Sequence, residues 1–120
     1  MDKKTKKNLK EVEEEISCYQ PKKRIADAMR KLVHMGFSFS GHGCGFGGED
    51  FGMSFHTTKI TYYYVSICDE GRKVSVIFTF DDGHYIHTLA TGTIGKVLSF
   101  VEKTINGGAL DTVAKTTSKK

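Results

Sequence analysis

The spacing of hydrophobic and polar residues divides the chain into a helical first third, a strand-forming middle and one further helix. Apolar residues recur at helical spacing over residues 8–19 and again over about 21–35. Pro21 suits the first turn of the second helix, and Gly36 follows where a left-handed C-terminal cap belongs. The same spacing returns from Thr93 to Asn106 and predicts a last helix there.

Between the helical segments, the apolar residues alternate with polar ones, which is the period of a β-strand. Asp-Gly and similar turn sequences separate the runs, as in antiparallel hairpins. The expected strands lie near residues 37–40, 51–56, 60–68, 74–80 and 84–89. The predicted fold is therefore an α+β two-layer sandwich with about five antiparallel strands, helices on one face, and the order α-α-β-β-β-β-β-α.

The alternation also predicts the two faces of this sheet. One face carries large apolar side chains, namely Phe37, Phe39, Phe51, Met53, Phe55, Tyr63, Val65, Ile67, Val74, Val76, Phe78 and Phe80. The other face carries small, polar or aromatic residues, namely Ser38, Ser40, Gly52, Ser54, His56, Tyr62, Tyr64, Ser66, Cys68, Ser75, Ile77 and Thr79. We expect the helices to cover the first face and to leave the second, almost uncharged face open.

The 120 residues suffice for one domain, and their net charge of +4 lies in the ends. Residues 1–24 hold eight basic and five acidic residues, residues 25–106 hold seven and eight, and residues 107–120 hold three and one. We expect a disordered basic tail over residues 1–7, a single domain over 8–107, and a disordered tail over 108–120.

Three features of the sequence predict a cytoplasmic protein without membrane contact. No apolar stretch approaches the length of a membrane span, and the charged N-terminus does not resemble a secretory signal. The three cysteines, Cys18, Cys44 and Cys68, are too few and too widely spaced for a disulfide framework.

The glycine-rich segment 41–48 is the most unusual local feature, and its composition argues against regular structure. A phosphate-binding loop would open a helix, whereas Glu49-Asp50 and a strand follow here. His42 and Cys44 are metal-ligand types, but no second pair completes a site. We therefore expect a hairpin tip or contact loop, and neither a cofactor nor a metal.

Catalytic patterns are equally incomplete. His56-Thr57-Thr58 fits a paired His-x-Thr phosphoesterase motif, but His87-Thr88-Leu89 does not. No nucleophile, base and orienting group can be assembled, so we expect no enzyme. A small metal-dependent or histidine-based hydrolase is the weakest alternative.

Lys22, Lys23 and Arg24 lie in the first turn of the second helix, where positive charge opposes the helix dipole. With Arg30 and Lys31 they give this helix a basic outer face. Acidic residues of the preceding helix can neutralise this face, and a phosphate backbone is the alternative partner.

These observations favour a small non-enzymatic intracellular binding protein of the inhibitor, adaptor or regulator type, a class that includes accessory proteins of phages and mobile elements. It would dock a protein partner through the open sheet face, the glycine-rich loop or the basic helix. A nucleic-acid partner is the alternative. The open sheet also allows a homodimer. The candidate partner-binding residues are Lys22, Lys23, Arg24, Arg30, Lys31, His42, Phe46, His56, Tyr62, Tyr64 and Ile77.

Overall fold

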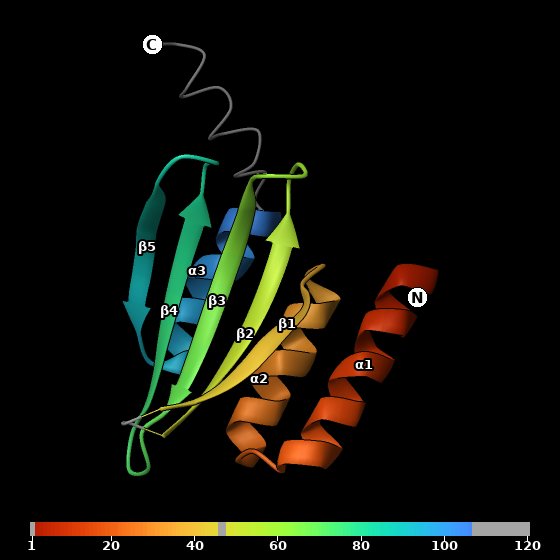
Figure 1. The fold of residues 1–120 in the computed structure, drawn as a ribbon, viewed down its shortest axis with the longest axis vertical. Coiled ribbons are helices and arrows are strands. Elements are labelled where there is room, and N and C mark those ends of the chain that lie inside the picture. The colour runs from red at the N-terminus through yellow and green to blue at the C-terminus, as the bar shows by residue number, and fades with distance from the viewer. Residues whose placement is uncertain (1, 46–47, 107–120) are drawn as a thin grey trace.

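A computed structural model describes residues 2–45 and 48–106 and confirms the expected α+β architecture (Figure 1). Five antiparallel strands form one sheet, and the helices and strands follow one another in the expected order. The elements are α1 (Lys3–Tyr19), α2 (Lys23–His34), β1 (Ser38–Gly45), β2 (Gly48–His56), β3 (Tyr62–Asp69), β4 (Val74–Asp81), β5 (Ile86–Gly92) and α3 (Ile94–Asn106). None of the described helices combines the length and apolar character that a membrane span requires.

The sheet is a simple meander in which each strand pairs with its neighbours in the sequence. α2 and α3 lie behind one face of the sheet, and α1 packs beside α2 and beyond the β1 edge (Figure 1). The opposite face of the sheet carries no helix among the described residues. This arrangement places one hydrophobic core between the sheet and the helices.

The alternation of side chains confirms the predicted core face. Most of the apolar residues predicted for the core face are buried, and the other three, Phe39, Phe55 and Phe80, pack against the core while partly exposed. The largest fully buried side chains include Tyr63, which stacks on Phe78 with 5.6 Å between ring centroids. Burial of this face is the main source of stability, since apolar burial contributes about 25 cal/mol per Å².

The first helix begins earlier than the hydrophobic period indicated. Residues 3–7, expected to be a disordered tail, form the first turns of α1, and this part of the prediction is wrong. The Asp2 side chain caps the helix by accepting a hydrogen bond of 2.7 Å from the Thr5 amide. The predicted tail at 108–120 lies outside the described residues.

The glycine-rich segment is also more regular than expected. Gly41, Gly43 and Gly45 continue β1 and pair with β2, so the expectation of an irregular segment is wrong up to residue 45. A β-bulge at Ser40 interrupts the register between Phe39 and Gly41. The bulge exchanges the two faces along β1, so that His42, like Phe39, lies on the core side.

The turn between β4 and β5 is built by Asp82. One oxygen of its carboxylate accepts hydrogen bonds from the amides of His84 and Tyr85, and the other lies 2.7 Å from Nε2 of His87. These bonds occupy residues 82–85, so β5 begins two residues later than expected. A second bulge, at Leu89, then carries the strand on to Gly92.

A matched pair of isoleucines tests which face holds the fold together. Ile67 is fully buried on β3, whereas Ile77 is 37% exposed on the open face of β4. We expect Ile67→Ala to lower the free energy of unfolding by about 2–5 kcal/mol. Ile77→Ala should cost no more than about 1 kcal/mol. Urea denaturation measures both, and equal losses would contradict this assignment of the core.

The Asp82 turn predicts a loss of stability in acid. The backbone amide of Tyr85, together with His87 and the His84 amide, holds the pKa of the Asp82 carboxyl well below its ordinary value. A lowered pKa stabilises the folded state above the unfolded-state value near 4, and this contribution disappears as the pH falls further. Thermal denaturation between pH 7 and pH 2 should show a smaller decrease for Asp82→Asn than for the wild type. If the melting temperatures of the wild type and Asp82→Asn decreased equally with pH, this role for Asp82 would be contradicted.

Candidate partner-binding surface

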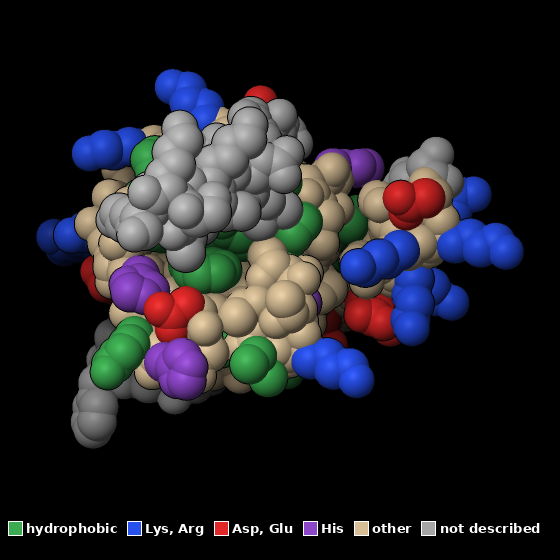
Figure 2. All heavy atoms as spheres, turned by 90° about the horizontal axis from the view of Figure 1, so that it is seen from above, with side chains coloured by type: hydrophobic (Ala, Val, Ile, Leu, Met, Phe, Trp, Pro, Cys, Tyr) green, Lys and Arg blue, Asp and Glu red, His purple; other side chains and the backbone are tan. Residues whose placement is uncertain are grey.

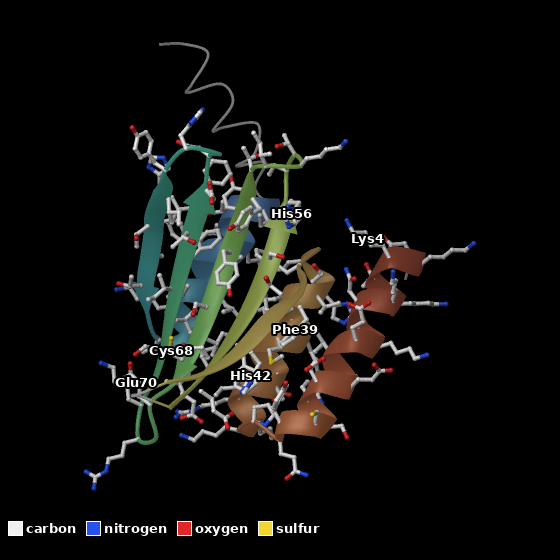
Figure 3. The ribbon with its side chains drawn as sticks, in the orientation of Figure 1. Lys4, Phe39, His42, His56, Cys68 and Glu70 are labelled. Atoms are coloured by element: carbon white, nitrogen blue, oxygen red, sulfur yellow. The ribbon has the colours of Figure 1, made fainter. Side chains whose placement is uncertain are left out.

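The open face of the sheet is a continuous uncharged surface across its centre. Strand pairing aligns Ser54, Tyr64 and Thr79 in one row, and Gly52, Ser66 and Ile77 in the next. This face turns toward the viewer in Figure 3, away from α2 and α3. The predicted alternation is therefore confirmed here, except for Ser40, which occupies the bulge.

Tyr64 lies flat across the neighbouring strand over Gly52. A Cβ atom added to Gly52 would meet the Tyr64 hydroxyl directly and would lie 2.6 Å from Cζ of the ring. The Ser40 side chain at the bulge lies close enough to the Tyr64 hydroxyl to influence its pKa. Burial raises the pKa of the Tyr64 hydroxyl above its ordinary value. The Tyr64 ring thus occupies space on β2 that is free only because residue 52 is a glycine.

A second aromatic group continues this surface toward the end of the sheet. The ring of Tyr62 lies 6.4 Å from that of Tyr64 and 5.0 Å from the imidazole of His56. His56 lies near the end of β2 in Figure 3. His56, Tyr62, Tyr64 and Ile77 therefore all lie on the open face, as the sequence predicted. We call this group, with Thr79, the aromatic strip.

Among the described residues of the strands, charged side chains lie at the borders of the open face. Asp50 pairs with Cys68 in the register toward one end, and Asp81 pairs with Tyr62 toward the other. Burial, assisted by a hydrogen bond with Asp50, raises the pKa of the Cys68 thiol. A raised thiol pKa disfavours the reactive thiolate, so Cys68 is poorly suited to act as a nucleophile.

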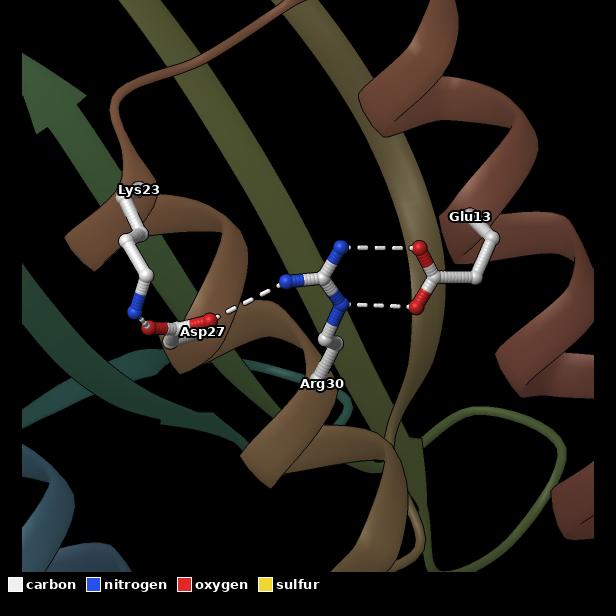
Figure 4. Close-up of polar contacts among 4 residues, drawn as sticks. All are labelled: Glu13, Lys23, Asp27 and Arg30. Carbon is white, nitrogen blue, oxygen red and sulfur yellow. Dashed lines mark hydrogen bonds and ion pairs between the residues drawn. The ribbon is translucent and has the colours of Figure 1, made fainter.

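Most cations of the basic helix are neutralised by partners within the molecule. Arg30 makes a two-pronged contact with Glu13 of α1, at 2.6 and 2.9 Å, and also binds Asp27 (Figure 4). Asp27 also accepts a hydrogen bond of 2.9 Å from Lys23. The hydrogen bond from Arg30 lowers the pKa of the Glu13 carboxyl. Exposed pairs of this kind contribute little stability singly, but they join α1 to α2.

Lys22 and Lys31 tie the same helix to other elements. The ammonium of Lys22 lies 3.0 Å from an Asp69 carboxylate oxygen and donates to the Gly71 carbonyl. Lys31 lies 3.5 Å from a carboxylate oxygen of Glu102 on α3. These contacts show that acidic residues of the same molecule neutralise part of the basic face of this helix.

Arg24 belongs to a different group, which the sequence analysis missed. With Arg72 and Lys73 of the β3–β4 turn, it lines a hollow of about 380 Å³ at the N-terminus of α3, beside Thr93 and Gly95. Arg72 and Lys73 are far from Arg24 in the sequence, so no local pattern could have linked them. We call Arg24, Arg72 and Lys73 the cationic rim.

His42 occupies a position that the sequence did not indicate. Its ring stacks on Tyr19 of α1, with centroids 3.8 Å apart, and lies 4.9 Å from the Phe51 ring. The side chain is only 9% exposed, and its stacking on Tyr19 places it between β1 and α1. Its buried Nε2 has no hydrogen-bond partner among the described residues and lies 3.6 Å from a Glu49 oxygen. His42 therefore fastens α1 to the sheet; its expected display in a contact loop is wrong.

The other candidate residues do not form a metal-binding group in the part of the chain that the structure describes. Phe46 lies outside the described residues. Across residues 2–45 and 48–106, no group of three histidine, cysteine or carboxylate side chains is arranged to hold a metal ion. Cys18 and Cys68 are free cysteines. The imidazole of His87 is directed at Asp82 of the turn.

Comparison with protein-family models, with curated proteins and with solved structures finds no match for this chain.

Two substitutions separate the stacking role of His42 from its polar role. His42→Ala removes the contact with Tyr19, and we expect it to lower the unfolding free energy by about 1–3 kcal/mol. His42→Phe keeps the stacked ring and removes a buried nitrogen that has no hydrogen-bond partner among the described residues. It should be at least as stable as the wild type in chemical denaturation. Equal destabilisation by both variants would contradict the stacking role.

Proposed function

We propose that this chain is a non-enzymatic binding protein that docks a protein partner through the open face of its sheet. The observation that supports this function is the uncharged aromatic strip, set on the one sheet face that the described helices leave uncovered. Tyrosine is enriched at protein interfaces, whereas lysine and carboxylates are depleted at their centres. The composition of the strip fits that pattern.

The orientation of Tyr64 adds to this proposal. A tyrosine that is already held in place loses little side-chain entropy when a partner covers it. Tyr64 already packs over Gly52 on its own sheet, so binding would not have to order the ring. Tyr62 and Ile77, beside it, keep part of their surfaces exposed for contact. The proposed interface is therefore centred on β3 and β4.

A nucleic-acid partner is the second candidate, and the cationic rim favours it. Arg24, Arg72 and Lys73 surround the hollow at the N-terminus of α3, a geometry in which phosphate groups would meet positive charge. The binding affinity would then fall steeply with salt concentration. Replacing all of the cationic rim by alanine should reduce the slope of log K against log salt by about 0.9 for each duplex phosphate that the rim neutralises.

An affinity capture with matched variants tests the two candidates together. Tagged protein is incubated with an extract of its source cells, with and without nuclease, and the captured components are identified and quantified by mass spectrometry. We expect one stoichiometric protein that survives nuclease treatment. Tyr62→Ala and Ile77→Lys should each weaken its binding at least about tenfold, because aromatic and central interface residues carry most of the binding energy.

The control variants are Arg24→Ala and Lys73→Ala, which alter the cationic rim and leave the strip intact. They should retain the protein partner. Recovery of nucleic acid, with loss of all partners after nuclease and on substitution of the rim, would overturn the protein-docking proposal.

A further inference from the structure

The outer edge of β5 is an unpaired strand edge. β5 pairs with β4 on one side, and no described strand pairs with its other side. The sequence of β5 contains no lysine, arginine, carboxylate or proline, although such residues commonly protect edge strands from association. Its exposed hydrophobic residues are Ile86, at 68%, and Leu89, at 37%. This edge therefore presents both free backbone groups and apolar surface.

The opposite edge of the sheet is not equivalent. α1 lies beyond β1 in Figure 1, and Tyr19 stacks on His42 there. Many lysines of the chain also belong to α1, and Figure 2 shows Lys and Arg side chains gathered around it. A second copy of the same chain would meet the charged helix α1 at the β1 edge, whereas β5 itself contains no lysine, arginine or carboxylate.

The helix beside β5 extends this apolar border. Glu102 of α3 pairs with Lys31 of α2, which fixes one flank of α3 toward α2. Phe100 precedes Glu102 by two residues, so at 3.6 residues per turn it projects from nearly the opposite flank, toward the β5 edge. Its ring contacts Phe78 at 6.1 Å between centroids and stays 45% exposed.

We propose that β5 pairs antiparallel with β5 of a second copy, so that one sheet continues through both molecules. A two-fold axis perpendicular to the sheet would place both α3 helices on the same face and bring their Phe100 side chains together. Leu89 lies near the middle of β5, so the axis would bring its two copies close to each other. The two α1 helices, with their lysines, would lie at the far ends of the joined sheet.

The expected association is moderate. A strand of seven residues and a few apolar side chains from each copy make a small interface, and interfaces below about 1,200 Å² are weak or transient. The bulge at Leu89 further shortens the regular ladder. The pairing does not use the aromatic strip, so this inference is independent of the proposed function.

Sedimentation equilibrium between about 2 and 200 µM protein tests the proposal, since weak interfaces dissociate in this range. We expect the weight-average mass to rise from that of a monomer to that of a dimer. Leu89→Lys and Phe100→Lys should weaken dimerisation at least about tenfold, because each places like charges near the axis. Ser99→Lys, on the same helix, and Ile77→Lys, on the open face, are the matched controls and should leave dimerisation unchanged.

Hydrogen exchange gives a second measurement that does not depend on variants. Amides of β5 should exchange more slowly at high protein concentration than at low concentration. A wild-type mass that stays monomeric at about 200 µM would overturn the proposal. It would also be overturned by a dimer that Ile77→Lys disrupts and Leu89→Lys and Phe100→Lys leave intact, because that dimer would use the open face.

Discussion

The structure depends on one constraint: in the described residues, α2 and α3 cover a single face of the antiparallel sheet, and α1 packs beside α2 at the β1 edge. Side chains alternate strictly between the faces of a strand, so covering one face decides the environment of every second residue. The core therefore collects phenylalanine, valine, isoleucine and Tyr63 from the sheet, while serine, threonine and glycine remain outside with Tyr62 and Tyr64. The open face is a consequence of how the helices are placed.

The two bulges adapt this plan at both edges of the sheet. The bulge at Ser40 turns His42 inward, where its ring joins Tyr19 to the sheet and holds α1 against the β1 edge. It also leaves the Ser40 side chain close to the Tyr64 hydroxyl. One inserted residue thus affects both the packing of α1 and the surroundings of Tyr64. The bulge at Leu89 sits on the edge that no described element covers.

The alternation of apolar residues predicted the core face and the open face well. Large apolar and small polar residues alternate along these strands, and this two-residue period shows directly which residues share a face. The same approach failed in the glycine-rich segment, since Gly41 and Gly43 have no side chains to show which face they occupy. The start of α1 was missed because its lysines carry no hydrophobic period, and Asp2 capping is a single local bond. Neither the packing of Tyr64 over Gly52 nor the cationic rim could be predicted, since both bring together residues that are distant in sequence.

The open sheet face is uncharged at its centre and carries aromatic side chains, and most cations of α2 form ion pairs within the molecule. These properties suit contact with a protein surface better than contact with a phosphate backbone. The most direct measurement is hydroxyl-radical footprinting of the chain in its captured complex, compared with the free chain. Our account predicts that Tyr62, Tyr64 and Ile77 lose reactivity in the complex while Lys73 of the cationic rim keeps it. Protection of the rim with unchanged labelling of the aromatic strip would contradict the account.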